Sequence, residues 1–203
     1  MRFHKISAQN PLVLASASPR RERLLSRIGL PFDSMASRIN EEDIIGDPAL
    51  GSRMLAMKKA TDVYARIRPR WVMGADTIVV VNDEILGKPD DNKEARRMLG
   101  LLSGREHRVI TGFCVLNPAG EVSHTEAVTT TVRIKGLSEL EIEAYTNMDE
   151  PYDKAGGYAV QGMGSFMVKE VSGSYTNVVG LPLCEVIEAL ISAGAIERFP
   201  LPR

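Results

Sequence analysis

The stretch from Trp71 to Asp90 holds the residues best suited to chemistry. Asp76 follows one apolar run and precedes another, Ile78 to Val81, and such runs bounded by turn residues are typical of buried strands. A carboxylate among core strands loses hydration, which costs free energy unless a cation or a donor compensates. We expect a Gly-Ala-Asp-Thr turn at the rim of a sheet, with Lys88 beside Asp76. A buried aspartate that only holds its own turn is an equally good interpretation of this stretch.

Two arginines form a second candidate site. Ser18 suits an N-cap and Pro19 suits the first helical position, so Arg20 and Arg21 fall in the first turn of a helix. Cations there oppose the helix dipole by about 0.3–1 kcal/mol each. Free N–H groups and forked guanidiniums at such a place suit a phosphate, which we expect to lie near Ser16 as well. This interpretation is favoured over two solvated arginines because the sequence accepts a penalty that it could avoid.

Apolar periodicity and turn residues predict strands and helices along the whole chain. Further strands are expected over residues 12–15, 32–36, 109–116, 122–134, 166–171 and 175–179. Helices are expected to begin at Pro19, Asp47, Asp91, Ser138 and Pro182. Neither an internal repeat nor a linker is visible. We therefore expect one α/β domain over residues 1–203, with a mixed twisted sheet, flanking helices and two lobes around a cleft.

Residues 150–164 are rich in glycine and carry Asp153, Lys154 and Gln161. Glycines let the backbone approach a ligand closely, and the polar side chains among them could contact it. The segment therefore predicts a binding loop and not a core element. A flexible connection is the weaker alternative, because the segment carries specific polar groups.

Composition limits the partners of the protein. The 203 residues are 44% hydrophobic and 25% charged, with a formal net charge of −1, so no global field favours nucleic acid or an anionic membrane. Apolar runs fall short of a membrane span, and the N-terminus lacks the apolar core of a signal peptide. Cys114 and Cys184 match no metal spacing and suit a reducing compartment. We expect a cytoplasmic protein with no nucleic-acid or membrane partner.

Together the candidate residues suit a polyphosphate and a hard metal ion. The candidate cations are Arg20, Arg21, Lys59, Lys88 and Lys154. The candidate carboxylates are Glu41, Asp76 and Asp153. Mg²⁺ or a similar ion takes oxygen ligands and substrate phosphates together. No Walker A pattern, HExxH motif or convincing Ser/Cys–His arrangement is found, so metal-assisted attack of water on phosphorus is the reaction class that remains.

The chain resembles the Maf family of nucleoside triphosphate pyrophosphatases from about residue 12 to residue 195, and the resemblance rests on seven motifs in the same order. They are LASASPRRERLL at 14–25, LAMKKA at 55–60, GADT at 74–77, LGKP at 86–89, LSGREHRV at 102–109, DKAGGYAVQG at 153–162 and NVVGLPL at 177–183. The resemblance implies a fold like that of the inosine triphosphate pyrophosphatases, and hydrolysis between the α and β phosphates with a divalent metal, Mg²⁺ or Mn²⁺. It makes Asp76 the proton acceptor and a metal ligand. It makes Arg20, Arg21, Lys59, Lys88 and Lys154 phosphate-binding residues.

Within the family, Arg20, Thr77 and Gln161 resemble the group that acts on dTTP and UTP. A glutamine amide can donate to O4 and accept from N3–H of a pyrimidine. The 7-methyl-GTP group tends to carry an aromatic residue, Gln and Glu at these places. The chain has Asn-Glu where many members have an acidic pair, and we expect Glu41, not Glu42, to bind the metal. A non-catalytic nucleotide-binding regulator of cell division is a further alternative, and a homodimer is left open.

Overall fold

The computed structural model describes residues 3–40, 46–67 and 69–201, and its centre is a seven-stranded mixed sheet. The strands are β1 (Leu12–Ala15), β2 (Phe32–Ser34), β3 (Val72–Val81), β4 (Glu84–Leu86), β5 (Glu106–Leu116), β6 (Val122–Ile134) and β7 (Val168–Ser172). Their order is β2-β1-β3-β5-β6-β7, and β4 pairs with β3. β1 runs parallel to β2 and β3, and the remaining pairs are antiparallel. The expected mixed α/β sheet is confirmed.

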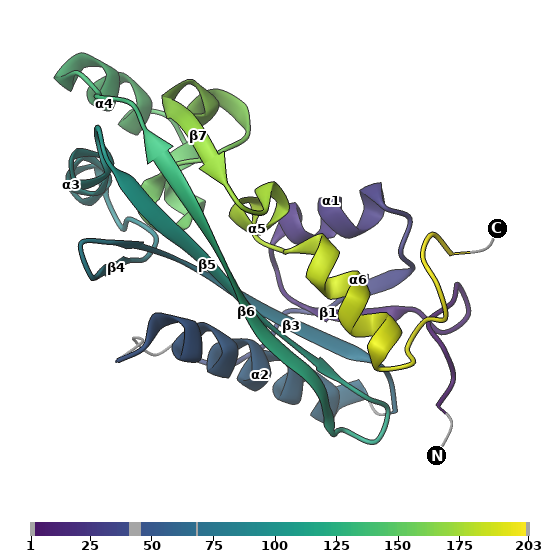
Figure 1. Ribbon diagram of the computed structural model, residues 1–203. Helices are drawn as coiled ribbons and strands as arrows, with labels where there is room; N and C mark the ends of the chain where they lie inside the picture. The colour runs from purple at the N-terminus through teal and green to yellow at the C-terminus, as the bar shows by residue number, and fades with distance from the viewer. Residues whose placement is uncertain (1–2, 41–45, 68, 202–203) are drawn as a thin grey trace.

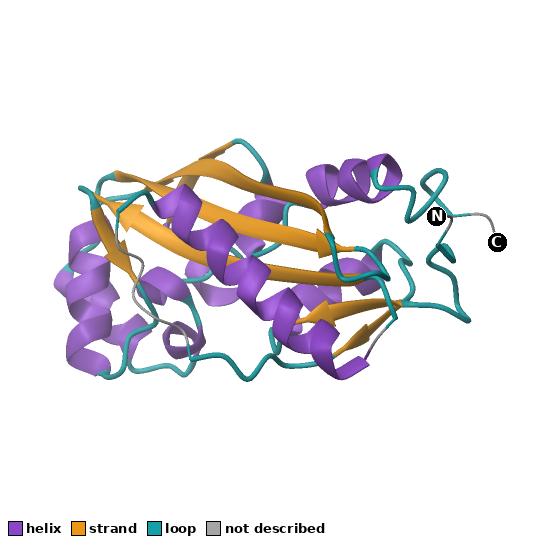
Figure 2. Ribbon diagram, turned by 90° about the horizontal axis from the view of Figure 1, so that it is seen from below, coloured by secondary structure: helices purple, strands orange, loops and turns teal. Residues whose placement is uncertain are grey.

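Helices cover both faces of this sheet (Figure 1). They are α1 (Pro19–Arg27), α2 (Pro48–Ile67), α3 (Asn92–Leu102), α4 (Glu139–Thr146), α5 (Tyr175–Val179) and α6 (Leu183–Ser192). The long α2 crosses one face by itself, as Figure 2 shows from below. α1, α5 and α6 lie on the opposite face, while α3 and α4 lie together at one end. The expected flanking helices are therefore present.

Alternation along β3 separates the two faces of the sheet, because successive side chains of a strand point to opposite sides. Val72 packs with Ala56, Ala60 and other α2 residues in one apolar cluster. Met73 packs on the other side, with residues of α1 and α6 such as Leu25. By the same alternation, Asp76 belongs to the α2 face and Thr77 to the α1 face.

The sheet divides at β3. β1 pairs with Val72–Gly74, and β4 pairs with Val79–Val81 on the same edge. Neither strand pairs with residues 75–78, whereas β5 pairs with the other edge of β3 from Val72 to Val80. The division places Asp76 and Thr77 beside a gap between strands instead of deep in a continuous sheet.

Three local predictions were wrong. Residues 74–77 form no turn, because β5 gives β3 an unbroken antiparallel partner through them. Residues 175–179 form a helix and not a strand, since Ser174 caps it by accepting a hydrogen bond from the Asn177 N–H. Residues 150–164 form short 3₁₀ turns that supply Tyr158 to a core cluster, so this segment is also a core element.

Candidate active site

A cavity of about 990 Å³ lies at the division in the sheet. Its wall combines the turn before α1, the middle of β3, the β4 end, residues of α2 and α5, and the glycine-rich segment 150–162. Most of the residues selected from the sequence line it: Ser16, Arg20, Arg21, Lys59, Asp76, Thr77, Lys88, Lys154 and Gln161. The volume falls within the range of small-molecule sites, about 300–1,000 Å³. Segments distant in sequence therefore form one concave site.

Asp76 and Lys59 form a buried ion pair in this wall. Lys59 Nζ donates to Asp76 Oδ1 over 2.7 Å, and the two residues are only 6% and 7% exposed. The partner expected from the hairpin was Lys88, but the lysine in contact with Asp76 comes from α2. A close cation and a hydrogen bond compensate the lost hydration of the carboxylate, as its setting requires.

Two glycines bring α2 close enough for this contact. A Cβ on Gly74 would lie 2.0 Å from the backbone oxygen of Ala56. Gly112 of β5 lies opposite Asp76 of β3 in the antiparallel pair. A Cβ on Gly112 would lie 2.3 Å from the backbone carbon of Ser52. Only glycine permits such an approach of helix backbone to sheet. These contacts fix the height of α2 and therefore the position of Lys59.

Arg20, in the first turn of α1, pairs with Asp153. Arg20 Nη1 donates to Asp153 Oδ2 over 2.5 Å, and Nη2 donates to the Asp153 backbone oxygen over 3.1 Å. Lys154 contacts the same carboxylate and donates to the Glu150 backbone oxygen over 2.6 Å. Burial by itself would raise the pKa of Asp153, but Lys154 and Arg20 hold that pKa below its ordinary value. Asp153 is thus an anion held by two cavity cations.

Arg21 is engaged by the protein itself. Its guanidinium donates to Gly180 O over 2.7 Å, to Thr77 Oγ1 over 2.9 Å and to Ser16 Oγ over 3.1 Å. Thr77 Oγ1 lies 2.9 Å from Thr111 Oγ1, which donates to the Asn177 backbone oxygen. The arginine therefore joins α1 to β3 and to the residue that ends α5.

The remaining predicted residues lie at different depths. Lys88 is exposed at the end of β4, and Gln161 is half-buried in the glycine-rich segment. Glu41, the expected metal ligand, lies outside the described residues. Sequence reasoning passed over Glu150, although it begins the glycine-rich segment and lines the cavity. No periodicity or motif spacing could have shown its contacts, because they depend on how the segment folds back.

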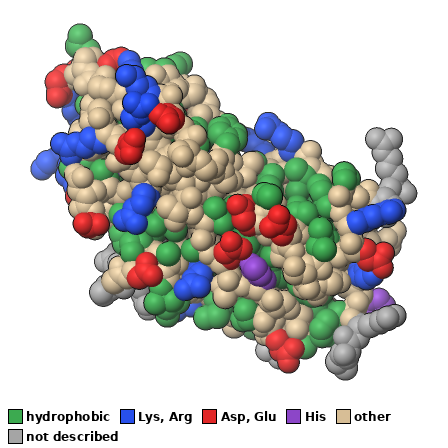
Figure 3. Space-filling model, in the orientation of Figure 1, with side chains coloured by type: hydrophobic (Ala, Val, Ile, Leu, Met, Phe, Trp, Pro, Cys, Tyr) green, Lys and Arg blue, Asp and Glu red, His purple; other side chains and the backbone are tan. Residues whose placement is uncertain are grey.

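Charge outside the cavity is mixed. On the face shown in Figure 3, lysine and arginine side chains are interspersed with acidic ones, and no single basic patch is seen there. Within the part of the chain that the structure describes, no helix has the length and apolar content to cross a membrane.

Comparison with known proteins places the chain in a family. The family model for Maf-like proteins matches residues 11–193. The dTTP/UTP pyrophosphatase of Geobacter metallireducens is 52% identical over 186 residues, which cover 91% of this chain and 97% of the relative. That of Syntrophotalea carbinolica is 47% identical over 195 residues, covering 95% and 89%. Among solved structures, the Staphylococcus aureus Ham1 protein has a TM-score of 0.46 and 14% identity, covering 78% of this chain and 80% of that one. The resemblance seen in the motifs is confirmed, and the chain belongs to the Maf family.

Proposed function

We propose that this protein is a nucleoside triphosphate pyrophosphatase that hydrolyses dTTP and UTP to the monophosphate and pyrophosphate. The observation that carries the proposal is the buried Asp76–Lys59 pair in the wall of a cavity that Arg20, Lys88 and Lys154 also line. The proposal is supported by relatives that are 47% and 52% identical to this chain over nearly its whole length and are named dTTP/UTP pyrophosphatases. Modified pyrimidine triphosphates are included as substrates.

The cations divide the work of holding the triphosphate. Arg20 offers a planar fork that can bind two phosphate oxygens, and it reaches them by exchanging Asp153 for the substrate. Lys88 and Lys154 also line the cavity and supply point charges, and Lys154 contacts the same Asp153 carboxylate as Arg20. Arg21 contributes from within the protein, because it holds Thr77 and Ser16 in place.

Asp76 acts on the attacking water. Lys59 holds Oδ1, and the hydrogen bond orients the carboxylate so that Oδ2 can accept a proton from water. Lys59 reaches Asp76 from α2, on the face of the sheet to which the Asp76 side chain belongs. In this arrangement the acid, its orienting lysine and the phosphate cations come from different elements, so the reacting groups meet only in the folded chain.

A divalent ion fits this site when the substrate supplies part of its ligands. Among the described residues no group of three His, Cys, Asp or Glu side chains could hold a metal ion. Mg²⁺, however, is commonly held by one or two carboxylates together with substrate phosphates. Asp76 would be one such ligand, and Glu41 is proposed as the second. When bound, Mg²⁺ or Mn²⁺ would draw electron density from the phosphate under attack.

Base recognition is assigned to Gln161, assisted by Arg20 and Thr77. The amide of Gln161 can donate to uracil or thymine O4 and accept from N3–H, a pattern that cytosine reverses. A site built to pair a donor and an acceptor rejects a base that leaves them unpaired. We further propose that the protein works in the cytoplasm on free nucleotides, without nucleic-acid or membrane partners, and a homodimer stays open.

The test is a panel of nucleoside triphosphates, including 7-methyl-GTP, with Mg²⁺ or Mn²⁺ and with EDTA. We expect release of pyrophosphate from dTTP and UTP, and loss of turnover with EDTA. Orthophosphate as the product would contradict the proposal. Preference for 7-methyl-GTP would favour the second substrate group. Tight binding with no turnover would favour the regulator of cell division.

Asp76→Asn is the key variant in this assay, with Asp83→Asn as its matched control. Asp83 lies in the exposed β3–β4 turn with a φ of 62°, a backbone conformation that asparagine adopts readily. Both variants remove one negative charge from the same hairpin. We expect turnover to be lost in the first and kept in the second.

A further inference from the structure

Glu150 holds the segment that carries Gln161. Its Oε1 accepts hydrogen bonds from the Gly164 N–H over 2.8 Å and from Tyr145 Oη over 2.9 Å. Its Oε2 accepts from the Met163 N–H over 3.1 Å. One carboxylate therefore binds two consecutive backbone N–H groups just after Gln161.

Tyr145 holds the same segment on its other side. While its hydroxyl donates to Glu150, its oxygen accepts a hydrogen bond from the Ala159 N–H over 3.2 Å. Tyr145 of α4 is buried within the apolar cluster that also contains Tyr158. The backbone before and after Gln161 is thus tied to one pair of side chains, Tyr145 of α4 and Glu150 of the 3₁₀ turn that follows it.

Two glycines fit this pair closely. A Cβ on Gly162, which has a φ of +74°, would lie 2.4 Å from Glu150 Oε2. A Cβ on Gly164 would lie 2.5 Å from Ala159 O and 2.6 Å from Tyr145 Oη. The segment therefore turns back around Glu150 and Tyr145 without space for a side chain. Such contact limits the positions that Gln161 can take.

Glu150 also fixes a cation of the site. Its backbone oxygen accepts a hydrogen bond from Lys154 Nζ over 2.6 Å, and the residue itself lines the cavity. Burial would raise the pKa of Glu150, but the two backbone N–H groups and the Tyr145 hydroxyl outweigh burial and lower that pKa. The carboxylate is therefore charged at neutral pH, which agrees with the three hydrogen bonds that its two oxygens accept.

We infer that Glu150 is a positioning residue for base selectivity, which acts by holding the Gln161 amide in the orientation that pairs with O4 and N3–H. This inference rests on the proposed function and deepens it. The carboxylate does not touch the reacting phosphates in this assignment. Removing it should therefore weaken recognition of the base and leave the chemical step almost unchanged.

The experiment compares Glu150→Gln with wild type for UTP, dTTP and CTP. A glutamine amide places an N–H₂ group opposite one of the two backbone N–H groups, so the segment loses one of its anchors. We expect KM for UTP and dTTP to rise about tenfold with kcat within about threefold, and the preference over CTP to fall by a similar factor. The Met163 and Gly164 amides should exchange hydrogen faster, which NMR can measure without turnover. Asp149→Asn, an exposed neighbour with no side-chain capping bond, is the matched control.

Three outcomes would overturn the inference. Unchanged selectivity in folded Glu150→Gln would do so, and so would an equal loss of kcat for every triphosphate. Unchanged amide exchange would remove its structural basis. If Glu150→Gln does not fold, Tyr145→Phe keeps the carboxylate, removes the shared hydroxyl and should shift KM in the same direction by a smaller factor.

Failure of the proposed function is separable from failure of this inference. If wild type binds but does not hydrolyse triphosphates, the same variants are compared by calorimetry with the α,β-methylene analogues of UTP and CTP. Loss of the uridine preference in Glu150→Gln supports the inference in that case, and its retention overturns it. Wild type that binds neither analogue overturns both.

Discussion

Lys59 and Asp76, 17 positions apart, meet across the interface of α2 with β3 at 2.7 Å from Nζ to Oδ1. The two side chains keep only 8% and 10% of their exposure, so both charges are largely removed from water where they meet. Breaking a buried pair from one side leaves an uncompensated charge, whereas replacing both partners removes the problem. Single and double substitutions of the pair can therefore distinguish its contribution to catalysis from its contribution to stability.

Asp76→Asn should remove activity and also lower stability. Loss of a proton acceptor costs about 10²–10⁴-fold in kcat. The free energy of unfolding should fall by about 1–3 kcal/mol, less than for a pair enclosed in a dry core, because both residues line the cavity. The double variant Asp76→Asn, Lys59→Met should regain stability without regaining activity. Denaturant unfolding and pyrophosphate release measure the two effects, and recovery of turnover in the double variant would refute the assignment of Asp76.

Gly112→Ala should displace α2 from the sheet. Its Cβ would meet the Ser52 backbone at 2.3 Å, and helix backbone cannot yield as a side-chain end can. We expect a loss of about 1–3 kcal/mol in unfolding free energy, with reduced kcat because Lys59 moves with α2. Gly100→Ala is the control, because nothing lies within 4 Å of that site in α3, and alanine should stabilise the helix by about 0.5–1 kcal/mol there. Equal effects of the two changes would contradict this packing.

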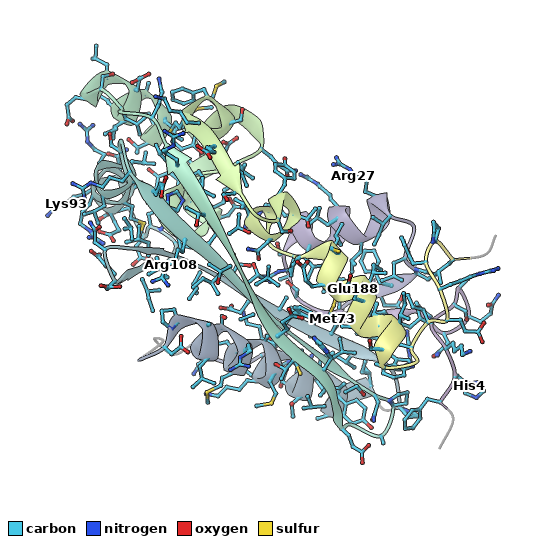
Figure 4. The ribbon with its side chains drawn as sticks, in the orientation of Figure 1. His4, Arg27, Met73, Lys93, Arg108 and Glu188 are labelled. Atoms are coloured by element: carbon cyan, nitrogen blue, oxygen red, sulfur yellow. The ribbon has the colours of Figure 1, made fainter. Side chains whose placement is uncertain are left out.

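Arg20→Met should weaken substrate binding without unfolding the protein. The Arg20–Asp153 pair is partly exposed, and such pairs contribute about 0–1 kcal/mol to stability. A charge-assisted contact to phosphate is worth more, so KM for UTP should rise about tenfold or beyond. Arg27→Met in the last turn of α1 is the control, since Arg27 points away from the sheet (Figure 4). Steady-state kinetics of both variants would show the difference, and a matching rise in KM for Arg27→Met would count against a local role.

His107 should make the protein sensitive to acid. It is 3% exposed on β5 and shares a 2.6 Å hydrogen bond with Tyr158, and burial lowers the pKa of His107 to about 4. Above pH about 6.5 the imidazole is neutral in both the folded and the unfolded chain, so it adds no pH dependence. Between pH about 6.5 and about 4 only the unfolded chain takes up the proton. Stability should therefore fall by about 1.4 kcal/mol per pH unit, to a total of about 3 kcal/mol.

His107→Gln isolates this contribution, because other groups also titrate in acid. Its unfolding free energy should depend less on pH over the same window than that of wild type. His4→Gln changes an exposed histidine near the N-terminus and should keep the wild-type slope (Figure 4). Denaturant midpoints at half-unit pH steps give the comparison, and identical slopes in wild type and His107→Gln would contradict the prediction.

Local patterns gave most of the elements. The predicted helix start at Pro19 and the predicted 122–134 strand agree with the structure, and the helix expected from Asp47 begins at Pro48, because proline geometry and apolar periodicity act over a few residues. The turn at Asp76 was wrong, since no local signal reports that β5 would pair through it. The strand predicted for residues 175–179 was also wrong, because a short β-branched run suits either a strand or a capped helical turn. The single domain over residues 1–203 stays a prediction.

The sequence by itself determined which residue types were available and that one acid would need a cation. Only the tertiary structure decided which residues pair. Asp76 pairs with Lys59 and not with Lys88, Arg20 pairs with Asp153, and Arg21 donates to Thr77 and Ser16. The physical reason is that the strength of an ion pair depends on the distance between the two charges and on their burial. Both depend on contacts between segments far apart in the chain, such as the approach of α2 that two glycines permit.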